Sequence, residues 1–295
     1  MEVFKKFFDE KKLLFDESMK NHTTFEIGGP AKLMFLPAHP GDVHRAISIC
    51  KGQKIPYFIL GNGSNVLVSD NGFDGVIIKL YNFTNVQVEN KVVKAQAGVD
   101  MRELSKFAME KGLTGLEFAE GIPATVGGAV CMNAGAYGGE IKNIITKVDV
   151  LRNGEIKSLL NSELEFGYRT SLVKKENLTV LSATFSLEYG DKEEIKSKMT
   201  DFNQKRRDKQ PLEYPSAGSI FKRPEGNFAG KLIMESGLMG KNIGAAYVSE
   251  KHAGFIVNKG GATAKEVKEL ISYIQNTVYE KFNVKLEREV IFLGD

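Results

Sequence analysis

A glycine-rich run over residues 121–139 constrains the fold of this chain more than any other stretch. Six of its 19 residues are glycine, and mostly small or apolar side chains separate them. Each glycine inside a helix costs about 1 kcal/mol relative to alanine, so the run is predicted not to form a stable helix. The high glycine content is instead typical of a backbone segment that passes close to a large flat ligand. Packing as an ordinary loop is the alternative.

A second glycine-containing loop, Gly-Asn-Gly-Ser-Asn, occupies residues 61–65 between apolar segments 57–60 and 66–68, which are predicted strands. It is not the dinucleotide fingerprint of a Rossmann fold, because Val66 stands where a third glycine belongs and no helix follows. The loop is typical either of an Asn/Gly turn or of bare amides that approach a phosphate. Residues 226–231 lack the spacing and the hydroxyl of a P-loop.

Composition excludes several classes of protein. The chain has 295 residues, of which 42% are hydrophobic and 26% charged, and this mix argues against disorder, collagen and coiled coil. A net charge of +3 predicts no nucleic-acid partner, and the absence of an apolar run of about 18 residues predicts no membrane insertion. Cys50 and Cys131 are interpreted as reduced core residues, and the scattered histidines predict no metal site. We expect a cytoplasmic protein, because residues 1–12 do not resemble a secretory signal. We also expect a monomer.

Patterning predicts an α+β protein. Helices are expected over 40–52, 100–111, 191–210 and 263–282, and a β-hairpin over 148–159 around Asn153-Gly154. Asp100 with Glu103, and Thr263 with Glu266, have the spacing of capping boxes. A strand is expected over 284–293. The stretch 210–218 is the best domain boundary, and we predict domains at 1–78, 79–207 and 208–295.

Three polar positions stand out from this framework: Arg169, Ser219 and Glu289. Each also has an ordinary explanation, as a solvated charge, a turn hydroxyl and a paired strand carboxylate respectively. On the predicted strand, Glu289 shares a face with Ile291 and Leu293. That placement suggests desolvation, which would raise the pKa of its carboxyl group.

Six motifs in order give the chain a family resemblance. They are residues 21–29, the loop 61–65, the run 121–139, Tyr168-Arg169, Gly218-Ser219 with 221–224, and Glu289-Val290 with Gly294. In this order and spacing the chain resembles the UDP-N-acetylenolpyruvoylglucosamine reductases, the flavoenzymes of early peptidoglycan synthesis. Only 50 positions separate Arg169 from Ser219, which is similar to the shorter, type II branch. Ala124 departs from the expected glycine.

The resemblance implies an FAD-binding fold of the vanillyl-alcohol-oxidase type in two subdomains, followed by an α+β substrate-binding domain. It implies FAD as cofactor, NADPH as reductant and a nucleotide-sugar substrate whose enolpyruvyl ether is reduced to UDP-N-acetylmuramate. Arg169, Ser219 and Glu289 would be catalytic, and Tyr168, Lys222 and Arg223 would bind substrate. The residues implied to bind cofactor are Gly61, Asn62, Gly63, Ser64, Asn65, Gly121, Ile122, Pro123, Thr125, Gly127, Gly128, Asn133, Gly135 and Arg206.

The residue types suit this chemistry. Arg169 can hold a carboxylate through two parallel hydrogen bonds, and Glu289 can assist only while it shares or carries a proton. Ser219 is a weak acid that would need support from a neighbour such as Lys222 or from water. Arg206 is equally well interpreted as a solvated helix end. Two rival functions remain: an FAD-dependent oxidase of an alcohol or hydroxy acid, and a non-catalytic nucleotide-sugar or nucleic-acid binding module.

Overall fold

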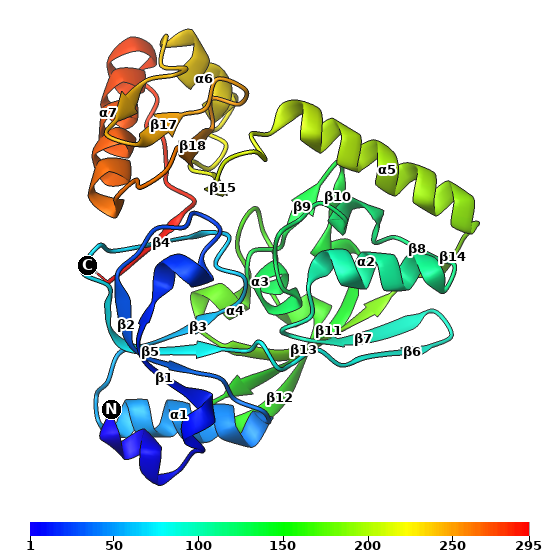
Figure 1. The fold of residues 1–295 in the computed structure, drawn as a ribbon. Helices are drawn as coiled ribbons and strands as arrows, with labels where there is room; N and C mark the ends of the chain where they lie inside the picture. Colours follow the sequence, from blue (N-terminus) through cyan, green and yellow to red (C-terminus); the bar gives the residue numbers. More distant parts are fainter. Residues whose placement is uncertain (295) are drawn as a thin grey trace. The chain divides into compact units, whose positions relative to one another are not determined.

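The chain folds into two compact units in the computed structural model, which describes residues 1–294. The first unit comprises residues 1–14, 34–62 and 76–206, and the second comprises residues 15–33, 63–75 and 207–295. Strands β1 (Leu13–Ser18), β2 (Pro30–Phe35) and β5 (Phe73–Lys79) each pass from one unit into the other along their length. Helices and strands are mixed throughout, which confirms the predicted α+β class (Figure 1). The three-part domain division stays a prediction.

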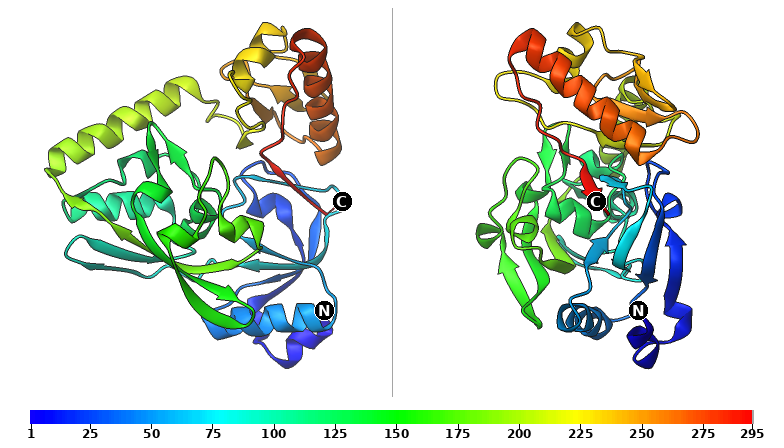
Figure 2. Two further views of the ribbon diagram at one scale, coloured as in Figure 1. Left: turned by 180° about the vertical axis from the view of Figure 1, so that it is seen from behind. Right: turned by 90° about the vertical axis from the view of Figure 1, so that its left-hand side faces the viewer.

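The first unit is built around a five-stranded antiparallel sheet of order β12-β11-β13-β7-β6. Its central strand β13 (Thr179–Ser186) is buried at seven of eight positions, so that it forms the middle of a core. Figure 2 shows this sheet from behind. The sheet strands and the other regular elements of this unit are β3 (Tyr57–Leu60), β6 (Val86–Glu89), β7 (Val92–Gln96), β8 (Leu113–Thr114), β9 (Gly135–Ala136), β10 (Gly139–Glu140), β11 (Ile145–Arg152), β12 (Glu155–Leu160), β14 (Glu188–Tyr189), α1 (Pro40–Gly52), α2 (Met101–Glu110), α3 (Val126–Cys131), α4 (Leu172–Lys175) and most of α5 (Lys192–Lys209), which continues past Arg206 into the second unit.

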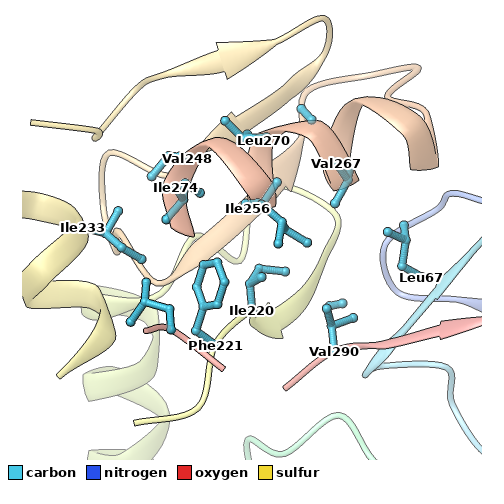
Figure 3. Packing of buried hydrophobic residues seen from close by; sticks show 14 of the residues in the cluster. Leu67, Ile220, Phe221, Ile233, Val248, Ile256, Val267, Leu270, Ile274 and Val290 are labelled. Carbon is cyan, nitrogen blue, oxygen red and sulfur yellow. The ribbon is translucent and has the colours of Figure 1, made fainter. Parts of the chain in front are cut away.

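The second unit is a small α+β layer in which one long helix covers an antiparallel sheet of order β15-β18-β17-β16. On helix α7 (Ala264–Phe282), buried residues such as Val267, Leu270 and Ile274 pack against the sheet (Figure 3). Their neighbours include Ile256 and Val248 of the strands and Ile220 and Phe221 beside them. Strand β19 runs parallel to β4, pairing Ile291 with Val66. The elements of this unit are β4 (Val66–Val68), β15 (Ser216–Ser219), α6 (Ala229–Glu235), β16 (Asn242–Ile243), β17 (Ala246–Val248), β18 (Phe255–Asn258), α7 (Ala264–Phe282) and β19 (Ile291–Leu293).

Local sequence signals account for most of these elements. The α7 capping box between Thr263 and Glu266 forms as predicted, and the α1 helix and the β11–β12 hairpin occupy the expected residues. The predicted capping box of α2 does not form. Asp100 caps the helix by accepting from the Arg102 amide, whereas Glu103 pairs with Lys106 one turn later.

The run 121–139 as a whole does not form a helix, as predicted, but α3 occupies six of its residues against expectation. Thr125 caps it by accepting from the Gly128 amide, and three of its side chains are buried in the core. A Cβ at Gly127 would lie 3.2 Å from the Cβ of Ala97. The glycine thus permits close packing, and tertiary contacts sustain a helix of six residues that propensity alone would not.

The predicted strand over 284–293 is also wrong for most of its length. Only Ile291–Leu293 forms a strand, and residues 283–290 run irregularly after α7 apart from an isolated bridge between Arg288 and Phe221. Glu289 is half-buried in this irregular segment and does not lie on a strand face. Residues 287–290 do hydrogen-bond to the segment 220–222, but the bridge between Arg288 and Phe221 is the one strand-like pair that residues 283–290 form.

Candidate active site

In the first unit, the start of the loop 61–65 is held against the helix N-terminus of α2. Asn62 Nδ2 donates to Asp100 Oδ2 at 2.8 Å, and the other oxygen of Asp100 accepts from the Arg102 amide at 2.8 Å. A Cβ at Gly61 would lie 2.5 Å from Thr125 Oγ1. The structure therefore brings together Gly61, Asn62 and Thr125, which the sequence had placed in separate motifs.

Asn133 joins the glycine-rich run to the turn that carries Arg169. It is 2% exposed, and its Nδ2 donates to Glu140 Oε2 at 3.0 Å and to the Gly167 carbonyl at 3.1 Å. Its Oδ1 accepts from the Lys142 amide. These hydrogen bonds are with protein, so they show a positioning function for Asn133. Its implied contact with a cofactor stays a prediction.

Arg169 lies in a tight turn and not on a strand edge. Its φ is +55°, and Gly167 and Thr170 close the turn through an isolated bridge. The guanidinium carbon is 5.2 Å from the ring centroid of the exposed Tyr168. The Lys174 ammonium donates to the Arg169 carbonyl at 3.3 Å, which anchors the turn. Tyr168 and Arg169 are thus neighbours in space as well as in sequence.

Arg206 is not a solvated helix end. Its side chain lies against Gly121, where an added Cβ would be 2.7 Å from both Cδ and Nη1. Burial lowers the pKa of its guanidinium below the usual value. Glu120 is the residue that precedes Gly121 in the chain, and the sequence analysis did not identify it. Its carboxyl group is buried, and desolvation raises its pKa.

In the second unit, the rest of the loop 61–65 holds the segment around Glu289. Gly63 has a φ of +65°, and a Cβ there would collide with the His22 carbonyl oxygen. Asn65 Nδ2 donates to the Glu289 carbonyl at 3.3 Å, while the Asn65 carbonyl accepts from the Ile291 amide at 3.0 Å. Asn65 therefore fixes the backbone on both sides of Val290. Ser64 lies half-buried beside it.

Ser219 and Glu289 are brought together in this unit. Ser219 ends β15, and the Glu289 amide donates to the carbonyl of the next residue, Ile220, at 2.8 Å. The Ser219 hydroxyl donates to the Phe221 carbonyl at 3.2 Å. The Lys222 amide donates to the Glu287 carbonyl at 2.8 Å, and their side chains form an ion pair.

The remaining substrate candidate, Arg223, lies beside an aromatic ring. Its guanidinium carbon is 4.6 Å from the ring centroid of the exposed Phe228. A guanidinium is the side-chain group best suited to bind a phosphate or carboxylate through paired hydrogen bonds. The second unit therefore carries a hydroxyl, two carboxylates and three cations on two adjoining segments, 219–223 and 287–289.

The donor set of the first unit fits a dinucleotide cofactor. Most amides of 122–128 donate to acceptors within the chain, such as that of Gly127 to the Ala97 carbonyl. The features that suit the cofactor are the close-packed glycine backbone at 61 and 121, Asn62 held by Asp100, and Arg206, which would supply a cation for a diphosphate. The open side of Gly128 supports the same interpretation, because its added Cβ would meet only Thr125 Oγ1, at 3.6 Å. No helix within residues 1–294 combines the length and apolar character needed to cross a bilayer.

Comparison with known proteins defines the class and then the family. A family model described as an FAD binding domain matches residues 31–159, which places the chain in the class of FAD-binding proteins. A second, described as the C-terminal domain of UDP-N-acetylenolpyruvoylglucosamine reductase, matches residues 210–293. Reductases of that name from Clostridium perfringens and from Caldanaerobacter subterraneus subsp. tengcongensis are each 49% identical, over 100% of this chain and 98% of theirs.

A solved structure gives the same result. The UDP-N-acetylenolpyruvylglucosamine reductase of Thermus caldophilus superimposes with a TM-score of 0.82 at 36% identity, covering 95% of this chain and 98% of that one. The chain belongs to the UDP-N-acetylenolpyruvoylglucosamine reductase family. The resemblance inferred from the six motifs is therefore confirmed.

Proposed function

We propose that this chain is an FAD-dependent oxidoreductase that reduces enolpyruvyl-UDP-N-acetylglucosamine to UDP-N-acetylmuramate with NADPH, in the synthesis of peptidoglycan precursors. Full-length similarity at 49% identity to reductases of that name carries the proposal. The match of residues 31–159 to an FAD binding domain supports the cofactor. The proposal places the enzyme in the cytoplasm as a monomer, with NADPH and substrate using one site in turn.

FAD supplies the means of accepting two electrons from NADPH and passing hydride to the β-carbon of the enolpyruvyl group. Hydride addition leaves a dianionic enediolate on the substrate, and fixed donors aimed at that charge contribute several kcal/mol. We assign Arg169 to the substrate carboxylate. Its turn conformation is fixed by the Lys174 contact, so the guanidinium starts from a preorganised backbone.

Ser219 is assigned the proton that is delivered to the α-carbon. Its hydroxyl is held by a hydrogen bond to the Phe221 carbonyl, and the Glu289 backbone is tied to the adjoining residue. Glu289 assists as a proton-sharing group at the enediolate. Lys222, Arg223 and Tyr168 are assigned to the nucleotide-sugar, because their cationic and aromatic side chains suit a diphosphate and a base.

The test separates the two half-reactions. In Ser219→Ala, NADPH should reduce the flavin at the wild-type rate, whereas reoxidation by substrate should slow by about 100-fold or more. Anaerobic stopped-flow absorbance of the flavin measures both steps. Ser216→Ala is the matched control, since Ser216 lies on the same strand and contributes backbone groups to its contacts with Thr24.

Four other results would contradict the proposal or a role assigned within it. Loss of flavin reduction in Ser219→Ala would refute its role as proton donor, and full activity in Glu289→Gln would refute an essential acid role for Glu289. Rapid reoxidation of the reduced protein by oxygen, without response to the nucleotide-sugar, would favour the oxidase alternative. A protein that purifies colourless and binds no FAD would favour the binding module.

A further inference from the structure

Glu120 is a buried carboxylate that the protein leaves partly unsatisfied. Its side chain is 9% exposed, and Oε1 accepts a hydrogen bond from Asn203 Nδ2 at 3.2 Å. Oε2 is buried and has no hydrogen-bond partner among residues 1–294. Buried polar atoms are nearly always hydrogen-bonded, so an orphaned carboxylate oxygen calls for a specific explanation.

The surrounding turn does not explain the orphaned oxygen. Glu117, three residues earlier, is 8% exposed, and both of its oxygens are satisfied. Thr114 Oγ1 donates to its Oε1 at 2.5 Å, and the Gly115 amide donates to its Oε2 at 2.7 Å. The short helical turn Glu117–Ala119 thus contains the fully bonded carboxylate of Glu117. It is followed by Glu120, whose Oε2 has no donor among residues 1–294.

A cation without a carboxylate partner lies close by. Arg206 follows Asn203 by three residues on α5, so the two side chains share a helix face. Its Cδ and Nη1 lie against Gly121, the residue after Glu120. Yet the Arg206 guanidinium forms no ion pair or hydrogen bond with any residue of the described chain, 1–294, and its electrostatic neighbours are Tyr137 and Arg102.

Two opposite charges therefore flank Gly121 without neutralising each other. A ligand that satisfies both must present an anion to Arg206 and a hydrogen-bond donor to Glu120. A ribose next to a diphosphate has this combination, since its hydroxyls donate and the phosphate oxygens accept. Carboxylates bind ribose hydroxyls in other dinucleotide sites for the same reason.

We propose that Glu120 Oε2 accepts a hydrogen bond from the adenosine ribose of bound FAD, while Arg206 binds the adjoining diphosphate. This assignment rests on the proposed function, because it takes FAD as the ligand. Desolvation raises the pKa of Glu120, against the opposing influence of the Asn203 hydrogen bond and of the cations Lys106 and Arg102; Glu103 acts in the same direction as desolvation. The ribose hydroxyl would supply the hydrogen-bond donor that Glu120 Oε2 lacks among residues 1–294.

The test measures two properties of the apoprotein, FAD affinity and thermal stability. Glu120→Gln should bind FAD about 10-fold more weakly, as expected for a lost charge-assisted hydrogen bond, while the midpoint of thermal unfolding of the apoprotein should rise. A purely structural role would lower the unfolding midpoint. Quenching of flavin fluorescence measures affinity without reference to turnover.

Glu117→Gln is the matched control, because it alters a satisfied carboxylate in the same turn. It should lower the unfolding midpoint and leave FAD affinity unchanged. FMN, which lacks the adenosine ribose, should bind wild type and Glu120→Gln equally. Unchanged FAD affinity in Glu120→Gln, or an equal loss for FMN, would overturn this inference alone. A wild-type apoprotein that binds no FAD would instead overturn the proposed function.

Discussion

Asp149 and Glu120 are two acidic side chains of the first unit in contrasting surroundings. Asp149 lies on β11 and accepts hydrogen bonds from Ser158 at 2.5 Å and from Ser182 and Lys94 at 2.8 Å. Burial alone would raise the pKa of Asp149, but these hydrogen bonds outweigh it and hold the pKa at about 2. At Glu120, desolvation outweighs a single hydrogen bond from Asn203, and the pKa is raised.

The number of hydrogen-bond donors distinguishes Asp149, a carboxylate that stabilises the fold, from Glu120, which we propose binds a ligand. Around Asp149, side chains from three other strands of the sheet, β12, β13 and β7, converge on both oxygens, so the carboxylate stabilises the sheet. Around Glu120, an uncharged amide donates to one oxygen, and no donor among residues 1–294 reaches the other. Changes at Asp149 should therefore alter stability, and changes at Glu120 should alter ligand binding.

The largest expected effect on stability comes from Asp149→Ala. It removes a charged acceptor and leaves Lys94 and two serines without it, which should lower the free energy of unfolding by about 3 kcal/mol. Urea unfolding of the apoprotein measures the loss. Glu155→Ala, on the neighbouring strand β12 and paired only with exposed Lys157, should stay within error of wild type. Equal losses in both variants would remove the contrast between bonded and exposed carboxylates.

Acid titration should give the next largest effect. The folded pKa of Asp149 is lowered from 3.8 to about 2. Its stabilisation is therefore fully present above pH 3.8 and lost as the pH falls through about 2, amounting to about 2 kcal/mol. The difference in unfolding free energy between wild type and Asp149→Asn should shrink over that interval. A difference that stays constant with pH would show that the carboxylate charge contributes nothing.

Much of the fold was predictable because local signals and tertiary packing agree. The capped helix α7, the helix α1 and the Asn153-Gly154 hairpin all follow from residues close in sequence. Prediction failed where packing overrides propensity, as in α3, where Gly127 is pressed against Ala97. It failed again over 284–290, where alternating side chains indicated a strand. Among these residues, the one strand-like pair is the isolated bridge between Arg288 and Phe221.

The candidate site was predictable only in part. Family resemblance pointed to Ser219 and Glu289, and the structure shows the link between them through the Ile220 carbonyl. Glu120 could not be found from sequence, because a glutamate beside a glycine is unremarkable until its burial and its missing donor are seen. The available signal was its position next to Gly121, at the start of the predicted ligand segment.

The smallest expected effect is a pH dependence at Glu120 with the opposite sign to that of Asp149. Its folded pKa lies above the ordinary 4.5, so the stability it contributes to the apoprotein is present below pH 4.5 and lost as the pH rises through the folded pKa. Glu120→Gln should abolish this decline. Because a ribose hydroxyl favours the carboxylate, wild-type FAD affinity should increase over the same interval, measured by fluorescence titration. Affinity that is independent of pH in wild type, or equally dependent in Glu120→Gln, would mean that the carboxylate does not meet the ligand.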